Sequence, residues 1–222
     1  MSKRRPEEAE NFRLLGHDPS AAWGGGSLVQ IVDGIAYVGA VGGSGFSGQE
    51  GFTIHDVSDP TKPRKIGEVN APPGVHMHKV RAVENEFLYV NAEKLPGDKG
   101  KDARAGFFIF DIKNRAEPRQ VGFFDLPGSG PHRFGVDNER KLAFFPNDAE
   151  GWDNRVIWTF DIKDPLKPEV ISTWGLPIQK ADGKGDSGDP MPAETTCTLH
   201  GPPVIRGNRM FAGFWGGRHG GD

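Results

Sequence analysis

The chain has 222 residues, a formal net charge of -3 at pH 7 and 36 % hydrophobic residues. These values are typical of one globular domain, and they disfavour nucleic acid or an anionic membrane as a partner. No apolar run approaches the roughly 18 residues of a spanning helix, and residues 1–12 lack the apolar stretch of a secretory signal, so we expect a cytoplasmic protein. The single Cys197 excludes an internal disulfide and a cysteine-based zinc site, which leaves the seven histidines as soft metal ligands.

Glycine (32) and proline (18) are spread along the chain among 15 phenylalanines, a pattern that predicts short strands separated by turns and an all-β fold. The first predicted strand is 11–18 (NFRLLGHD). Its Gly16 falls where Gly67 and Gly122 fall in later segments, so we interpret it as an outer strand without a sheet of its own. Such a strand is able to close the last blade of a ring and to remove an exposed sheet edge.

The rest of the chain is an internal repeat of four strands over about 50 residues. Each unit opens with a hairpin, at 28–41, 79–92, 133–147 and, in a fourth partial copy, 202–215. A second pair of strands follows at 52–69, 107–124 and 156–173. In each second pair a proline comes seven residues after an aspartate: Asp56 and Pro63, Asp111 and Pro118, Asp161 and Pro168. These aspartates are predicted to cap the turn before the outer strand.

This spacing predicts a single β-propeller domain over 1–222, with about three and a half four-stranded blades. The predicted blades span about 26–70, 76–125, 131–175 and, partially, 198–222, with an insertion at 178–195. Since a ring of six or seven blades needs more residues, we expect a truncated chain. A four-bladed ring and two chains pairing their open edges, a homo-oligomer, are the alternatives.

The phrase HDVSDPTKP, echoed as FDIKNRAEP and FDIKDPLKP, resembles the LVIVD repeat of bacterial β-propeller proteins. More distantly, with histidines at the starts of blades, the chain is similar to selenium-binding-protein-type propellers. The first resemblance implies the fold, and the second implies metal-dependent oxidation. Neither resemblance identifies a substrate, because fold does not imply function.

Three histidines share one phase of the repeat: His78, His132 and His200 each stand ten residues before an apolar position of the second strand. The first unit has Gly26 at this place. The phase predicts side chains that meet at the mouth of the central channel, where neutral imidazoles suit Fe, Cu, Zn or Mn. The alternative is structural: each ring hydrogen-bonds a carbonyl of a neighbouring blade. His76 could join the site if its segment is extended.

The loops of the same face carry the predicted acid–base residues. Glu194, at the end of the insertion, is the first candidate, followed by Glu93 and Glu150; Glu50 and Asp148 lie on equivalent loops. Solvated loop charges are the alternative. The remaining candidates are minor, with packing expected for His17 and His55, little reactivity for Cys197, and a place near the channel for His219.

Together these features predict a metal-dependent enzyme acting on a small organic substrate, with oxidation favoured over lyase or hydrolase chemistry. The rival hypothesis is a non-catalytic scaffold for protein–protein contacts, anchored by Phe46, Trp152 and Trp215. The two differ in one geometric expectation. An enzyme needs histidine rings that converge, whereas a scaffold leaves them in separate blade interiors.

Overall fold

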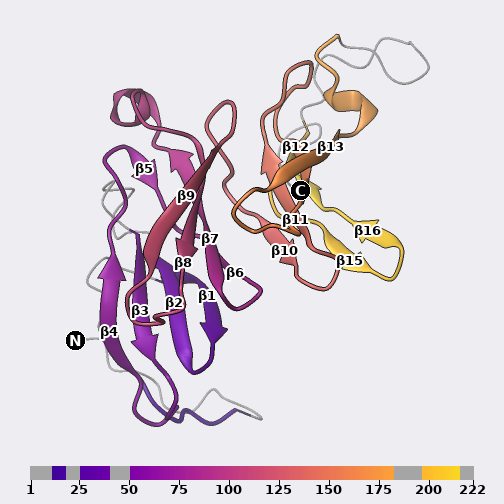
Figure 1. Ribbon diagram of the computed structural model, residues 1–222. Helices are drawn as coiled ribbons and strands as arrows, with labels where there is room; N and C mark the ends of the chain where they lie inside the picture. Colours follow the sequence, from indigo (N-terminus) through magenta and orange to yellow (C-terminus); the bar gives the residue numbers. More distant parts are fainter. Residues whose placement is uncertain (1–11, 19–25, 41–50, 183–196, 216–222) are drawn as a thin grey trace.

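The computed structural model describes residues 12–18, 26–40, 51–182 and 197–215, and it is all-β, as the sequence predicts. Successive antiparallel sheets follow one another along the chain, from the indigo and magenta strands to the orange and yellow ones (Figure 1). The only helices among the described residues are two short 3-10 turns, η1 (Gly97–Gly100) and η2 (Pro177–Gln179). None of the described helices has the length and hydrophobicity of a membrane span.

The first three sheets are each built from strands that are consecutive in sequence, and in the first and third the strands pair in that order. The first sheet contains β1 (Gly26–Val32), β2 (Ile35–Ala40), β3 (Phe52–Asp56) and β4 (Arg64–Val69). The second contains β5 (Val75–His76), β6 (Val80–Val83), β7 (Phe87–Lys94), β8 (Gly106–Asp111) and β9 (Arg119–Asp125), with β5 and β6 both paired to β7. The third contains β10 (Gly135–Asp137), β11 (Leu142–Asn147), β12 (Val156–Asp161) and β13 (Glu169–Trp174).

The last described strands form two separate pairs rather than a four-stranded sheet. They are β14 (Thr198–Leu199) with β17 (Phe214–Trp215), and β15 (Val204–Arg206) with β16 (Arg209–Phe211). The short β14 pairs with β17 as the short β5 pairs with β7 in the second sheet. His200 comes directly after β14, and His78 stands two residues after the end of β5.

The repeat is visible in the backbone at the outer edge of the first three sheets. A β-bulge interrupts the pairing of the third and fourth strands at Ile54/His55, Ile109/Phe110 and Thr159/Phe160, the same phase each time. Immediately after it, the side chain of the repeat aspartate accepts a hydrogen bond from the backbone N–H two residues on. The donors are Ser58 (3.1 Å), Lys113 (2.8 Å) and Lys163 (2.8 Å), so the predicted turn caps are confirmed.

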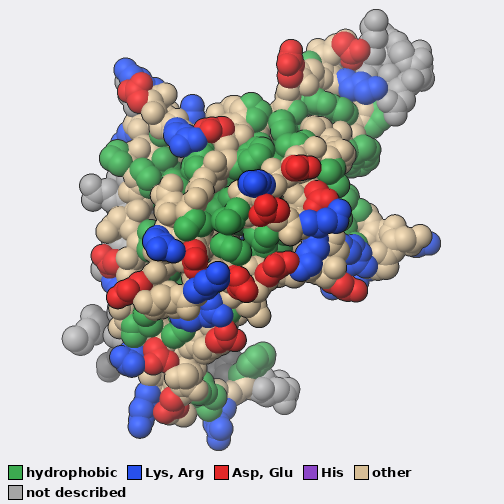
Figure 2. All heavy atoms as spheres, viewed as in Figure 1, with side chains coloured by type: hydrophobic (Ala, Val, Ile, Leu, Met, Phe, Trp, Pro, Cys, Tyr) green, Lys and Arg blue, Asp and Glu red, His purple; other side chains and the backbone are tan. Residues whose placement is uncertain are grey.

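The hydrophobic core lies between successive sheets, which face each other. Tyr37 and Phe52 of the first sheet pack with Leu88 and Phe108 of the second, and Phe107 of the second packs with Phe145 of the third at 4.4 Å between ring centroids. The strands of the second sheet lie between the first and third sheets and are buried on both faces, which explains why β7 and β8 are nearly continuous apolar runs. On the face in Figure 2, acidic and basic side chains are interspersed.

The two tyrosines bind neighbouring sheets in the same way. Tyr37 on β2 donates to the carbonyl oxygen of Arg115 at 3.0 Å, and Tyr89 on β7 donates to that of Pro165 at 2.8 Å. Both acceptors lie in the turn before the fourth strand of the next sheet. The first and second sheets are thus each fixed to the next sheet by a core and by one tyrosine hydrogen bond.

The N-terminal segment does not take the predicted position. Its described part, residues 12–18, forms no strand and lies against the β3–β4 turn, where Gly16 leaves no room for a Cβ beside the carbonyl oxygen of Pro60. Asp18 lies 3.2 Å from His55 of β3. The segment therefore contacts the first sheet and does not close the last one within this chain. The described part of the predicted insertion, residues 178–182, continues from η2.

Candidate functional site

Four histidines from three successive segments of the chain form a continuous row of rings. The ring of His76 stacks on that of His78 at 3.8 Å and 10°, and His78 lies 4.7 Å from His132 at a tilt of 45°. His132 in turn stacks on His200 at 5.2 Å and 19°. The three histidines of the shared repeat phase are thus brought side by side, and His76 extends the row.

The backbone that carries His76 and His78 is shaped by a single buried side chain, Asn91 of β7. Its Oδ1 accepts hydrogen bonds from the backbone N–H groups of His78 (3.0 Å) and Lys79 (2.8 Å), which lie in the gap between β5 and β6. Its Nδ2 donates to the carbonyl oxygen of Pro131 at 3.0 Å, directly before His132. Asn91 therefore holds two segments of the row at once.

The sequence analysis missed Asn91. Its signal is an asparagine in the middle of the apolar strand FLYVNA, where a buried polar side chain needs hydrogen-bond partners. Two bonds to backbone N–H groups replace the strand pairing that β5 and β6 leave open.

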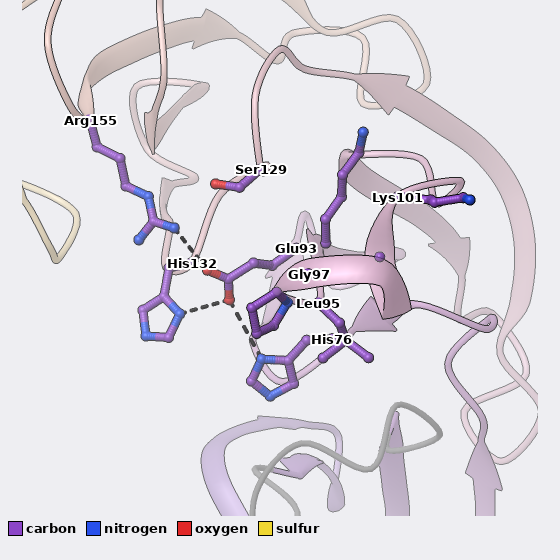
Figure 3. A pocket seen from close by; sticks show the side chains of 11 residues that line it. His76, Glu93, Leu95, Gly97, Lys101, Ser129, His132 and Arg155 are labelled. Atoms are coloured by element: carbon purple, nitrogen blue, oxygen red, sulfur yellow. Dashed lines mark hydrogen bonds and ion pairs between the residues drawn. The ribbon is translucent and has the colours of Figure 1, made fainter.

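Glu93 of β7 contacts His76 in its own sheet and His132 and Arg155 from later segments of the chain (Figure 3). It faces His76 across the β5–β7 pair, and its Oε2 accepts from Nδ1 of His132 at 2.8 Å and lies 3.5 Å from Nδ1 of His76. Its Oε1 accepts from Arg155 at 2.8 Å. Burial by itself would raise the pKa of Glu93, but the hydrogen bonds from the two histidines and the charge of Arg155 hold it below its usual range.

In this environment Glu93 hydrogen-bonds an imidazole of the row, and its acid–base role stays a prediction. Both carboxylate oxygens are already occupied, and a carboxyl with a lowered pKa is a weak base near neutral pH. Because the carboxylate can only accept, Nδ1 of His132 carries the proton in this contact, and Nε2 is the ring nitrogen left to bind a ligand. A carboxylate that fixes the tautomer of a histidine in this way is a common companion of metal ligands.

His78 is the most enclosed member of the row. Burial, followed by the charges of His76, Lys79 and His132, lowers its pKa to about 2, so the imidazole is neutral at pH 7. Its side chain is 1 % exposed, and its Nε2 has no hydrogen-bond partner among the described residues. On the other side, Nδ2 of Asn91 lies 3.2 Å from Nδ1. A buried ring nitrogen without a partner is costly unless something else binds it.

His200 closes the row at its more open end. Burial, with the positive charges of Arg133, His132 and Arg155, lowers its pKa as well. Its ring lies 6.2 Å from that of Trp215, which is 64 % exposed. The compact metal-capable group among the described residues consists of His76, His78 and Glu93, whose ligand atoms lie within 4.8 Å of one another.

The other predicted acid–base residues are not part of this cluster. Glu150 is exposed and, among the described residues, forms no hydrogen bond or ion pair with the row. Asp148 accepts hydrogen bonds from the backbone N–H and hydroxyl of Ser129. Three predicted residues, Glu194, Glu50 and His219, lie outside the described part of the chain, as does Phe46 of the scaffold hypothesis.

The minor candidates lie away from the row. His55 is hydrogen-bonded to Thr53 at 2.8 Å and to Asp18, so its role is polar rather than the expected packing. Burial raises the pKa of the Cys197 thiol, which disfavours a nucleophile. Trp152 is half-buried against Gly175, where it is poorly placed to anchor a partner.

A cavity of about 550 Å³ opens beside Glu93, which is a size typical of small-molecule sites. His76, His132 and Arg155 line one side, and the loop around η1 lines the other (Figure 3). Comparison of the chain with protein-family models gives no match, and comparison with curated proteins gives none either. The resemblance to LVIVD-repeat propellers therefore stays a prediction.

Proposed function

We propose that the chain is part of a β-propeller that binds a divalent transition metal on its histidine row and acts as a metal-dependent enzyme on a small organic substrate. The propeller architecture is supported by four features of the sheets. The sheets follow one another in chain order and share cores only with their neighbours. Each of the first three also has a β-bulge at one common phase and the same aspartate-capped turn before its outer strand.

One observation carries the metal proposal: the neutral, 1 % exposed imidazole of His78, whose Nε2 has no partner among the described residues, stands in a row of further imidazoles. Neutral histidines from separate segments that meet in this way are suited to Fe, Cu, Zn or Mn. An isolated structural histidine would instead be expected to satisfy both ring nitrogens with nearby polar groups.

The ring orientations indicate which histidines share the metal. His78 and His132 are tilted by 45°, so small rotations can direct their in-plane lone pairs to one point. His76 lies at only 10° to His78, and its ligand atom lies within 4.8 Å of those of His78 and Glu93, so we keep His76 as an additional ligand candidate. His200 is included because it shares the repeat phase of His78 and His132; its ring lies at 19° to that of His132 and would have to rotate to direct a lone pair to the same point. Glu93 orients His132.

A metal bound here would supply Lewis-acid or redox chemistry, and we favour oxidation, with lyase and hydrolase reactions as alternatives. The chain's own contribution is positional. Glu93 fixes the proton of His132 at Nδ1, and Arg155 balances the charge of Glu93. The neighbouring cavity holds the substrate next to the row. No protein carboxylate in the described residues is assigned to proton transfer.

The test is the metal content of the purified protein by plasma mass spectrometry, for the wild type and for histidine variants. We expect about one equivalent per chain in the wild type, steep loss in His78→Ala and His132→Ala, and full retention in His55→Ala, whose ring lies by Asp18. Glu93→Gln should keep the metal with roughly 10–100-fold lower affinity. A folded wild type without metal, or equal content in all variants, would overturn the proposal and favour the interaction scaffold.

A further inference from the structure

The cavity beside the histidine row has more positive than negative charge on its walls. Its charged lining residues are Glu93, Lys94, Lys101 and Arg155. Glu93 and Arg155 neutralise each other through a contact of 2.8 Å. The ammonium groups of Lys94 and Lys101 contact no carboxylate among the described residues. The cavity therefore offers two cations to whatever enters it.

The two ends of the cavity differ in chemistry. Figure 3 shows Lys101 on the side opposite His132 and Arg155. Leu95 and Pro96 lie among the lining residues and supply an apolar wall. A molecule that spans the cavity would have Lys101 at one end and the imidazole row at the other.

The surroundings of the row add to the positive field. Lys79, directly after His78, is 6 % exposed, and its ammonium group donates to the hydroxyl of Ser27 without contacting a carboxylate in the described part of the chain. An anion entering the site would be attracted by this field, and a cation would be repelled.

We propose that the ligand of this site is a small organic carboxylate, held by Lys94 and Lys101 with its other end against the histidine row. This inference rests on the proposed function for the identity of the site, and it adds the charge and shape of the substrate. The apolar wall favours a short carbon skeleton over inorganic phosphate, and the volume of about 550 Å³ is ample for one.

The experiment uses succinate as the probe and its neutral analogue succinamide as the matched control, at one ionic strength, with isothermal titration calorimetry on the full chain. We expect succinate to bind and succinamide to bind at least about tenfold more weakly. The double variant Lys94→Gln/Lys101→Gln should lose about tenfold in succinate affinity. Lys163→Gln, which removes an exposed lysine paired with Asp161, should stay within about twofold of the wild type.

Metal content measured on the same samples separates the two proposals. Succinate binding that depends on both lysines supports this inference even in a protein without metal, in which case only the proposed function fails. A metal-loaded protein that binds succinamide as well as succinate overturns the inference and leaves the metal proposal standing. Equal succinate affinity in the double variant and the wild type also overturns it. Circular dichroism of each variant confirms that the comparison is made on folded protein.

Discussion

At the scale of single residues, the candidate site depends on two side chains that bind across segments. Asn91 joins the His78 segment to the loop before His132, and Glu93 joins His132 to Arg155. The histidines were predictable from the sequence, because a shared repeat phase places equivalent residues at equivalent points. Glu93 was a candidate by its place in the repeat, but its pairing with His132 and Arg155 was not predictable, because these residues stand at unrelated phases and meet only once the sheets have packed.

Replacing Asn91 by alanine should destabilise the protein strongly. The substitution removes the acceptor for the buried N–H groups of His78 and Lys79, and each unsatisfied donor costs about 1–3 kcal/mol. We expect the free energy of unfolding, measured with urea, to fall by about 2–5 kcal/mol. The control is Asn114→Ala, whose side chain makes an exposed bond to Glu117 and should cost less than about 0.5 kcal/mol. Similar losses in both variants would contradict the assigned role of Asn91.

The buried tyrosines predict a loss of stability at alkaline pH. Burial raises the pKa of Tyr37 to about 12 and also raises that of Tyr89, whereas an unfolded chain has tyrosines near 10. The stabilising contribution is therefore complete below about pH 10 and is lost as the pH rises towards about 12, by up to about 1.4 kcal/mol per pH unit and tyrosine.

Urea midpoints measured from about pH 9 to about pH 11 check this dependence. Tyr37→Phe, which removes one of the two groups, should make the decline shallower by about half. Phenolate absorbance supplies an independent measure, since both hydroxyls should ionise only as the protein unfolds. A phenolate signal that develops at the ordinary tyrosine pKa in folded protein would show that the hydroxyls are accessible.

At the scale of elements, strand order and turn chemistry follow directly from the repeat, whereas the break between β5 and β6 does not. The apolar alternation around Val80 predicts a strand, but it does not show that pairing stops at Met77 and resumes after Lys79. That interruption is produced by the Asn91 side chain, a tertiary contact. The packing of residues 12–18 was also beyond the sequence pattern, which matched Gly16 to outer strands although Gly16 lies against Pro60 in the first sheet.

The contact between β2 and the histidine segment gives an element-scale prediction. A Cβ on Gly39 would lie 2.2 Å from the carbonyl oxygen of His78, so Gly39→Ala must push β2 away from that segment. We expect a cost of several kcal/mol in urea unfolding, on the order of other overpacked sites, together with reduced metal content. Gly97→Ala is not a matched control because Gly97 has positive φ, so Gly213→Ala, with open space around it, is the better choice. If Gly39→Ala is destabilised but keeps the wild-type metal content, the contact between β2 and the His78 segment contributes to stability and not to metal binding.

At the scale of the whole molecule, the cores between sheets are graded in size. The first two contain many fully buried residues, whereas the third consists of Phe144, Ile157 and Leu199 with partly buried neighbours. Side chains of β16, including Phe211, are exposed. The repeat predicted that neighbouring units pack on one another, but the extent of each interface depends on side-chain volumes that the repeat pattern alone does not specify.

Amide hydrogen exchange should therefore be fastest in the last strands. We expect β15 and β16 to exchange through local opening, with protection well below that of β7 and β8, which open only with the whole protein. Mass spectrometry of peptides from the exchanged protein measures both regions in one experiment, and β1, which has one exposed face, serves as the internal reference. Equal protection in β16 and β8 would show that the small third core is sufficient for full cooperativity.

The bonds of Glu93 also have a consequence for the order in which the chain is made. Its histidine partner His132 follows it by 39 residues and its arginine partner Arg155 by 62, so both leave the ribosome later. Until then Glu93 stands on a nascent chain as an ordinary carboxylate beside His76. The row of imidazoles grows from His76 towards His200 as translation proceeds, and the proposed set of metal ligands is complete only once His200, directly after β14, has been synthesised.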